Sequence, residues 1–213
     1  KSEIGPMSFR HFMLGAIAIF IYVGVEVGIP NVLQKWLQNG GLNVETGAEG
    51  IETVCAMLRP AAEGVNNSAI EYAIHGVASY VSKNHLTYQN GVRAGLKNAI
   101  NKATNKPIQA FLMTALEVCA TAEDAEFFAS KLSDEYLANF AARSLAQVEG
   151  TEPVVKSLIA AQAENGLSKA LLAQIASYKN IPAVESTLLG WLNGATEEEK
   201  TQIYLALGSC GGV

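Results

Sequence analysis

The stretch TAEDAEFFASKLSDEYLANFAARSLAQVEG, residues 121–150, is the first of three successive segments that align at a period of thirty residues. The second, TEPVVKSLIAAQAENGLSKALLAQIASYKN, covers residues 151–180, and the third, IPAVESTLLGWLNGATEEEKTQIYLALGSCGG, covers residues 181–212. Three columns agree in chemistry, namely Phe128, Leu158 and Leu188, then Leu145, Ile175 and Leu205, and next to them Ala146, Ala176 and Ala206. A fixed period of this length is typical of repeat proteins, whose units bury their apolar faces against one another.

Each segment predicts two short helices. Thr121 and Asp124 have the spacing of a helix start, and Thr196 with Glu199 predicts a capping box. We expect prolines in first helical turns and glycines where helices stop. These residues are Pro153 and Pro182 for the starts, and Gly150, Gly166 and Gly194 for the stops. The alanine column lets paired helices approach closely, and the larger aliphatic residues beside it fill the layer.

Residues 91–120 follow the same scheme with a slip of one residue. The slip places Ala115 and Leu116 in the alanine and aliphatic columns in swapped order, and Pro107 opens the second helix of this unit. Two earlier helices are predicted at a longer spacing, over residues 52–61 and 67–84. Because the chain lacks strand-like alternation from about Gly50 onward, we expect an all-α fold of four to five helical pairs over residues 50–213.

The two-helix unit of about thirty residues resembles the HEAT family. The likeness is to the short HEAT-like repeats first described in phycobilisome lyases, and FAARSLAQVEGTEPVVKSLIAA and IYLALGSCGG carry it best. The resemblance covers residues 50–213 and implies an α-solenoid of helical hairpins. It extends to the N-terminal portions of larger secreted bacterial proteins. Glu185 and Glu197 fall in columns that are apolar in neighbouring units, so the last repeat is expected either to cap the solenoid or to precede a truncation.

Residues 12–31, FMLGAIAIFIYVGVEVGIPN, differ from everything that follows them. The apolar run from Phe12 to Ile29 would be roughly 27 Å long as a helix, close to the thickness of a bilayer core. We therefore expect one hydrophobic helix within residues 1–30, preceding the repeats and able to contact or span a membrane, and a linker over residues 31–49. The flanking charges are Lys1, Arg10 and Lys35, and they would place the repeats outside the cytoplasm if the segment spans.

A second resemblance concerns this apolar segment alone. MLGAIAIFIYVGVEVGIP resembles the first helix of the second half of fucose-permease-type sugar:proton symporters of the major facilitator superfamily. In a transporter, Tyr22 and Glu26 would line the substrate pathway, since an ionisable residue at membrane depth usually faces a polar cavity. Alternatively, Glu26 marks the interfacial end of the run before Pro30. The chain as a whole could thus be a symporter fragment with an unrelated helical extension, or a chimeric reading frame.

Composition and motifs exclude several function classes. The net charge of −5 argues against nucleic acid as a partner, because nucleic-acid binding needs a basic surface. Cys55, Cys119 and Cys210 lack CxxC spacing, which predicts buried thiols and neither a zinc site nor a disulfide framework. No catalytic signature is present, so we expect no enzyme, no cofactor and no metal. The acidic run 197–199 is interpreted as helix-start charge.

The predicted function is therefore non-enzymatic protein binding or scaffolding. The partner would be another protein or a neighbouring domain of the same polypeptide, because stacked helical pairs present a long face instead of a single pocket. Exposed aromatic residues and arginines on the second helices are the expected contact points, since interfaces are enriched in these types. The candidates are Tyr136, Arg143, Tyr178 and Tyr204.

Overall fold

The structure, a computed structural model, describes residues 47–84 and 86–211, which belong to one compact unit. These residues form α-helices and short 3₁₀-helices, and no strand occurs among them, so the all-α prediction is confirmed for this part of the chain. None of the described helices is both long and apolar enough to cross a membrane. The predicted apolar helix within residues 1–30 and the linker up to residue 46 lie outside the described residues.

The helices follow one another in five pairs along the chain. The first members of the pairs are α2 (Gly47–Cys55), α4 (Leu86–Lys102), η3 (Ala122–Asp124) with α6 (Ala125–Ala129), α8 (Glu152–Ala160), and η4 (Pro182–Val184) with α11 (Glu185–Trp191). The second members are α3 (Ser68–Asn84), α5 (Lys106–Cys119), α7 (Ala138–Gln147), α10 (Lys169–Lys179) and α12 (Glu197–Cys210), and the short α9 (Gln162–Asn165) precedes α10. Helix α2 begins three residues before the predicted boundary at Gly50.

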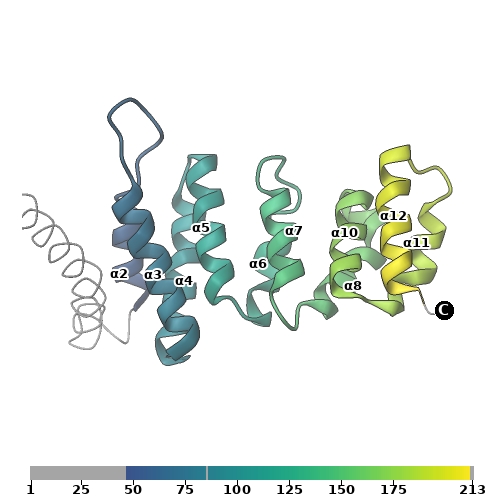
Figure 1. Cartoon of the computed structure of the whole chain (residues 1–213), viewed down its shortest axis with the longest axis horizontal. Coiled ribbons are helices and arrows are strands. Elements are labelled where there is room, and N and C mark those ends of the chain that lie inside the picture. The colour runs from purple at the N-terminus through teal and green to yellow at the C-terminus, as the bar shows by residue number, and fades with distance from the viewer. Residues whose placement is uncertain (1–46, 85, 212–213) are drawn as a thin grey trace, which may run out of the picture. The chain divides into compact units, whose positions relative to one another are not determined.

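Each helical pair contacts its neighbouring pairs along the chain. The second helices meet in one row, in which α3 contacts α5, α5 contacts α7, α7 contacts α10 and α10 contacts α12. The first helices form another row, in which α2 contacts α4, α6 contacts α8 and α8 contacts η4. Figure 1 shows the pairs in chain order, from α2 and α3 at one end of the described part to α11 and α12 at the other. Sequence neighbours are thus spatial neighbours throughout this unit.

The buried positions of the second helices keep the thirty-residue period only in part. Leu145 and Ile175 are buried at a spacing of thirty, as are Ala176 and Ala206. Other fully buried residues, namely Leu112, Ala141, Leu172 and Ile203, follow one another at spacings of 29, 31 and 31. The predicted column through Leu205 is therefore wrong at its last member, whose side chain is 59% exposed. Ala146 is only half-buried, so the alanine column fails at its first member. Irregular turns of different length before α7 and α10 shift the helical phase, which an alignment at constant period cannot follow.

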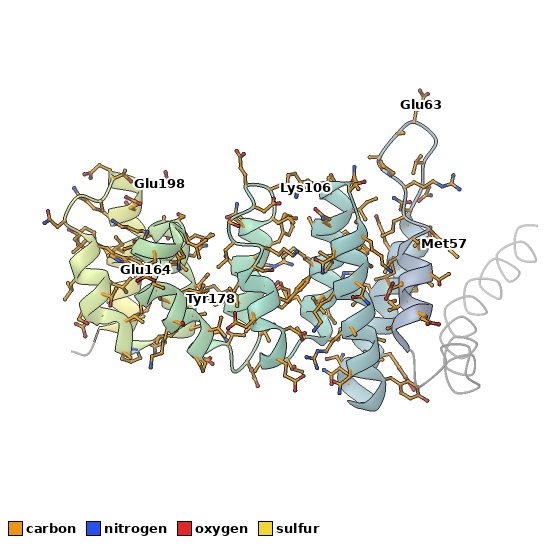
Figure 2. All side chains as sticks on the ribbon, turned by 180° about the vertical axis from the view of Figure 1, so that it is seen from behind. Met57, Glu63, Lys106, Glu164, Tyr178 and Glu198 are labelled. Atoms are coloured by element: carbon orange, nitrogen blue, oxygen red, sulfur yellow. The ribbon has the colours of Figure 1, made fainter. Side chains whose placement is uncertain are left out.

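The local signals for helix ends agree well with the structure. At the start of α12 the Glu199 N–H donates to Thr196 Oγ1 at 3.2 Å, and the Thr196 N–H donates to the Glu199 carboxylate at 2.8 Å. The predicted stop glycines all adopt positive φ, at 76° for Gly150, 65° for Gly166 and 84° for Gly194. The helix predicted over residues 52–61 is displaced toward the N-terminus, because α2 covers Gly47–Cys55 and a loop that follows it carries Glu63 at its tip (Figure 2).

The contact between α2 and α4 depends on a glycine. A Cβ on Gly95 would lie 2.2 Å from Ile51 Cγ2 and 2.5 Å from the Ala48 carbonyl oxygen, so the two helices can meet this closely only if residue 95 has no side chain. Gly76, in the middle of α3, is a contrasting case, because a Cβ there would meet nothing within 4 Å.

Gly95→Ala is therefore expected to destabilise the protein although alanine favours a helix. Overpacking typically costs about 1–3 kcal/mol, and the better helix propensity recovers at most about 1 kcal/mol. Gly76→Ala is the matched control and should be neutral or stabilising by up to about 1 kcal/mol. Urea unfolding followed by circular dichroism measures both. A Gly95→Ala protein as stable as Gly76→Ala would contradict the close approach of α2 and α4.

Candidate functional site

A buried cluster of charges lies between α4 and η3. Arg93 Nε donates to Asp124 Oδ2 at 2.5 Å, and Lys97 Nζ donates to Asp124 Oδ1 at 2.8 Å. The backbone N–H of Thr121 adds a third hydrogen bond to Asp124 Oδ2 at 3.0 Å, and Arg93 Nη2 also contacts the Glu123 carboxylate at 3.0 Å. Asp124 is fully buried, and both of its carboxylate oxygens accept hydrogen bonds from donors within the protein.

The arrangement of this cluster indicates that it stabilises the fold and does not act as a general base. Burial raises the pKa of the Asp124 carboxyl, but hydrogen bonds from Arg93, Lys97 and the Thr121 N–H outweigh it and hold the pKa below its ordinary value. Burial likewise lowers the pKa of Arg93, and its bonds to Asp124 and Glu123 more than compensate. A general base needs a free lone pair within reach of a substrate proton. Asp124 is fully buried and bonded to three protein donors, so it is out of reach of a substrate, and the cluster instead joins the second helical pair to the third.

Sequence reasoning assigned Asp124 only to a helix start and overlooked Arg93. The structure confirms the helix start, since η3 begins at Ala122, and adds the cation that Asp124 needs once it is buried. One signal was present. Arg93 stands next to Val92 and three residues before Leu96, which are both buried, so it falls on the apolar face of its helix. A charge in such a position requires a partner.

A second feature is a hollow of about 410 Å³ on the surface between α7 and α10. Its floor consists of small or apolar side chains, namely Ala142, Ala146 and Ile175. Its border consists of hydrogen-bonding side chains, namely Asn139, Arg143, Gln147, Gln174 and Tyr178. Two of the four predicted contact residues, Arg143 and Tyr178, are therefore brought together here from helices that are adjacent in the second row.

Arg143 and Tyr178 differ in how they are held at the hollow. Arg143 Nε donates to the Glu117 carboxylate of α5 at 3.1 Å, and Ser144 Oγ donates to the same oxygen at 2.8 Å. This ion pair with α5 restrains the guanidinium group before any partner arrives. Tyr178, labelled in Figure 2, is 68% exposed and supplies aromatic surface on the α10 side.

The remaining predicted contact residues are exposed but lie apart from the hollow. Tyr136 precedes α7 and stacks on Phe140, with ring centroids 6.3 Å apart and an interplanar angle of 15°. Tyr204 projects from α12. Neither residue lines the hollow. Tyr22 and Glu26 lie outside the described residues, and their role in a transport pathway stays a prediction.

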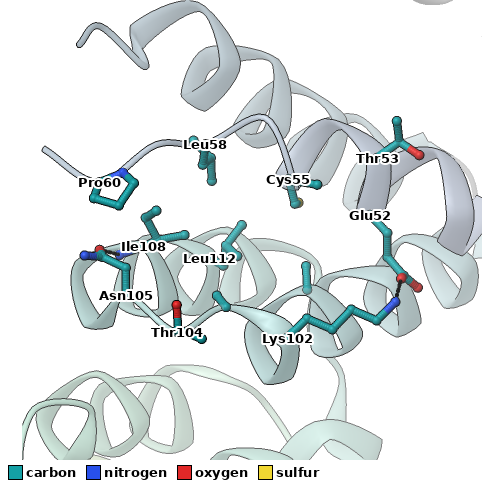
Figure 3. A pocket seen from close by; sticks show the side chains of 13 residues that line it. Glu52, Thr53, Cys55, Leu58, Pro60, Lys102, Thr104, Asn105, Ile108 and Leu112 are labelled. Carbon is teal, nitrogen blue, oxygen red and sulfur yellow. Dashed lines mark hydrogen bonds and ion pairs between the residues drawn. The ribbon is translucent and has the colours of Figure 1, made fainter. Parts of the chain in front are cut away.

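A further cavity of about 460 Å³ lies between α2, the loop that follows it, and the turn from α4 to α5 (Figure 3). Its one carboxylate, Glu52, accepts hydrogen bonds from Asn98 at 2.7 Å and from Lys102 at 2.5 Å. Its thiol, Cys55, is buried, and burial together with the Glu52 charge raises its pKa to about 12. Since the thiolate is the reactive form of cysteine, Cys55 is not a nucleophile at neutral pH.

The other two cysteines are buried as well, as the sequence predicts. Burial and the Asp124 charge raise the pKa of Cys119 to about 12, and burial raises the pKa of Cys210. Within residues 47–84 and 86–211, no group of three or more His, Cys, Asp or Glu side chains is arranged to hold a metal ion.

In comparisons with protein-family models, curated proteins and solved structures, the chain gave no match. The two features described above must therefore be weighed on their chemistry. The buried cluster is fully committed to internal bonds, whereas the hollow presents exposed side chains to solvent. The hollow between α7 and α10 is the candidate functional site.

The structural role assigned to the buried cluster can be tested with neighbouring carboxyl groups. Asp124→Asn should lower the free energy of unfolding by roughly 3–5 kcal/mol, because it leaves a buried cation without its main partner. Glu123→Gln removes a carboxylate that is 79% exposed from the same arginine, and its effect should stay below about 1 kcal/mol. Equal effects of the two variants in urea unfolding would contradict the assignment.

The ionisation of Asp124 also predicts how the free energy of unfolding depends on pH. The folded-state pKa of Asp124 lies below that of the unfolded chain, so its contribution is present above about pH 4 and is lost as the pH falls through the folded value. Wild-type protein should therefore lose more stability than Asp124→Asn when unfolding is measured at successively lower pH below about 4. Parallel pH profiles for wild type and Asp124→Asn would refute this.

Proposed function

We propose that the helical part of the chain is a non-enzymatic α-solenoid of HEAT-like hairpins that binds a protein or a neighbouring domain of its own polypeptide. The restriction of contacts to adjacent pairs supports the solenoid, because stacked repeats bury their cores only against their neighbours. The binding function is supported by one observation above all, the meeting of Arg143 and Tyr178 at the border of a single hollow.

The composition of the hollow favours binding over catalysis. Apart from Tyr178, its lining residues include none of the Asp, Glu, His, Cys, Ser or Lys side chains that usually act as general acids, bases or nucleophiles. Tyrosine and arginine are instead the types most enriched at the energetic centres of protein interfaces. The Glu117 ion pair restrains Arg143, which reduces the side-chain entropy that a partner would have to remove.

Binding through this hollow predicts a selective effect of two substitutions. A partner isolated by crosslinking to the full chain should bind Arg143→Ala and Tyr178→Ala proteins at least about tenfold more weakly, as expected for central interface residues. Tyr72→Ala is a matched control, because Tyr72 on α3 is 66% exposed, nearly the same as Tyr178. A partner whose affinity falls equally with Tyr72→Ala, or with none of the three, would contradict binding at the hollow.

The solenoid itself predicts tolerance to removal of its last pair. Deleting residues 181–213 removes η4, α11 and α12, whose contacts are with one another, with α8 and with α10. Because earlier pairs do not depend directly on them, α4 to α7 should keep their helicity and amide protection, while α10 loses protection. Hydrogen exchange by mass spectrometry measures this. Uniform loss of protection back to α4 would instead indicate one globally cooperative core.

A further inference from the structure

Three side-chain amides border the hollow without a hydrogen-bond partner among the described residues. They belong to Asn139 and Gln147 on α7 and to Gln174 on α10, and all three residues are exposed. Two other glutamines use their amides internally, since Gln89 Nε2 donates to the Cys119 carbonyl at 2.8 Å and Gln109 Nε2 donates to the Ile100 carbonyl at 2.9 Å. The amides at the hollow therefore remain available to a ligand.

The protein contains an example of how such an amide can bind main chain. Asn67 Nδ2 donates to the Arg59 carbonyl at 2.7 Å, while Asn67 Oδ1 accepts from the Arg59 N–H at 3.2 Å. One side-chain amide thus binds both polar groups of one residue in a non-helical loop. Side-chain amides are suited to this role because they are neutral and carry both donors and acceptors.

The spacing of the bordering residues fits an extended chain. Asn139, Arg143 and Gln147 follow one another at intervals of four residues on α7, which corresponds to roughly 6 Å along the helix axis. Gln174 and Tyr178 have the same interval on α10. In an extended peptide, groups that point in the same direction recur every second residue, or about 6.6–6.8 Å. Successive helical turns can therefore meet successive equivalent peptide groups.

The floor of the hollow and the charges of its lining residues both favour a neutral, extended ligand. Ala142 and Ala146 keep the floor low enough for a backbone to approach, and Ile175 adds apolar surface for a side chain. The one charged residue in the lining, Arg143, is already paired with Glu117, so neither a strongly acidic nor a strongly basic ligand is favoured. A ligand recognised through neutral main-chain groups matches this surface.

We propose that the hollow between α7 and α10 binds an extended peptide segment of a partner protein through its main chain. Asn139, Gln147 and Gln174 exchange hydrogen bonds with peptide groups, and Tyr178 packs against one of the ligand's side chains. This inference rests on the proposed function and specifies the form of its partner. It differs from docking of a folded helical surface, which would present side chains and no free peptide groups.

The test uses a random-sequence peptide library displayed on phage and selected against the immobilised full chain. Selected peptides are synthesised, and their affinity is measured by fluorescence anisotropy against wild type and the double variant Gln147→Ala/Gln174→Ala. We expect affinity for the double variant to fall about tenfold or more, as the loss of two hydrogen-bonding groups implies. Gln202→Ala on α12, away from the hollow, is the control and should bind like wild type. Circular dichroism of each variant establishes that it is folded.

Backbone N-methylation of the selected peptides isolates the main-chain contribution. It removes single N–H donors and leaves the side chains unchanged, so methylation at alternate residues should weaken binding to wild type and have little effect on binding to the double variant. Selection of no peptide, or of peptides insensitive to both changes, overturns the inference. If the affinity of the crosslinked partner still depends on Arg143 and Tyr178, the proposed binding function is retained without the extended-peptide inference. If that dependence is also missing, the proposed function and the inference are both wrong.

Discussion

The buried pair of Arg93 and Asp124 is the interaction on which the junction between the second and third helical pairs depends. At most junctions the first helices of adjacent pairs touch, but among the described helices α4 has no substantial contact with α6. The guanidinium of α4 and the carboxylate of η3 bridge this junction instead, at 2.5 Å, with Lys97 as a second donor. An ion pair without access to water holds its geometry tightly, because breaking it would leave an uncompensated charge in a medium of low dielectric constant. On the side of the first helices this junction is therefore held by electrostatics, while α5 and α7 meet on the side of the second helices.

That junction sets how α5 meets α7, which is one of the two helices that line the hollow. Glu117 on α5 reaches Arg143 and Ser144 on α7, and this contact exists only if the second and third pairs are in register. Farther along the row, Ser177 of α10 meets Ser209 of α12 at 3.0 Å. Polar contacts of this kind specify relative rotation more sharply than apolar packing does, since a hydrogen bond weakens steeply when its angle changes. The candidate site is thus built by register between pairs and not by any single helix.

This dependence explains which parts of the structure the sequence could predict. Helix starts and stops follow from neighbouring residues, so Thr196 with Glu199 and the three glycines at positive φ were found correctly. The predicted columns hold from Leu145 to Ile175 and from Ala176 to Ala206 but fail at Leu205 and Ala146, because turns of unequal length shift the helical phase. Arg93 was missed because its partner lies 31 residues away and becomes visible only when the pairs are stacked. Arg143 and Tyr178 were named from residue type alone; the amides beside them were not, since their availability depends on which helix faces meet.

Hydrogen bonding also separates the parts of the molecule that maintain the fold from the part that can recognise a partner. Asp124, Gln89 and Asn67 have protein donors or acceptors, and their desolvation on folding is compensated within the chain. Asn139, Gln147 and Gln174 are exposed to water instead, and any ligand that covers them must replace the hydrogen bonds to water or incur the cost of burying unsatisfied polar groups. An apolar helix laid on the hollow would leave these amides unpaired, whereas an extended backbone offers a donor and an acceptor at each residue. Selectivity for an extended segment therefore arises from the penalty imposed on other ligands as much as from the hydrogen bonds that the segment itself forms.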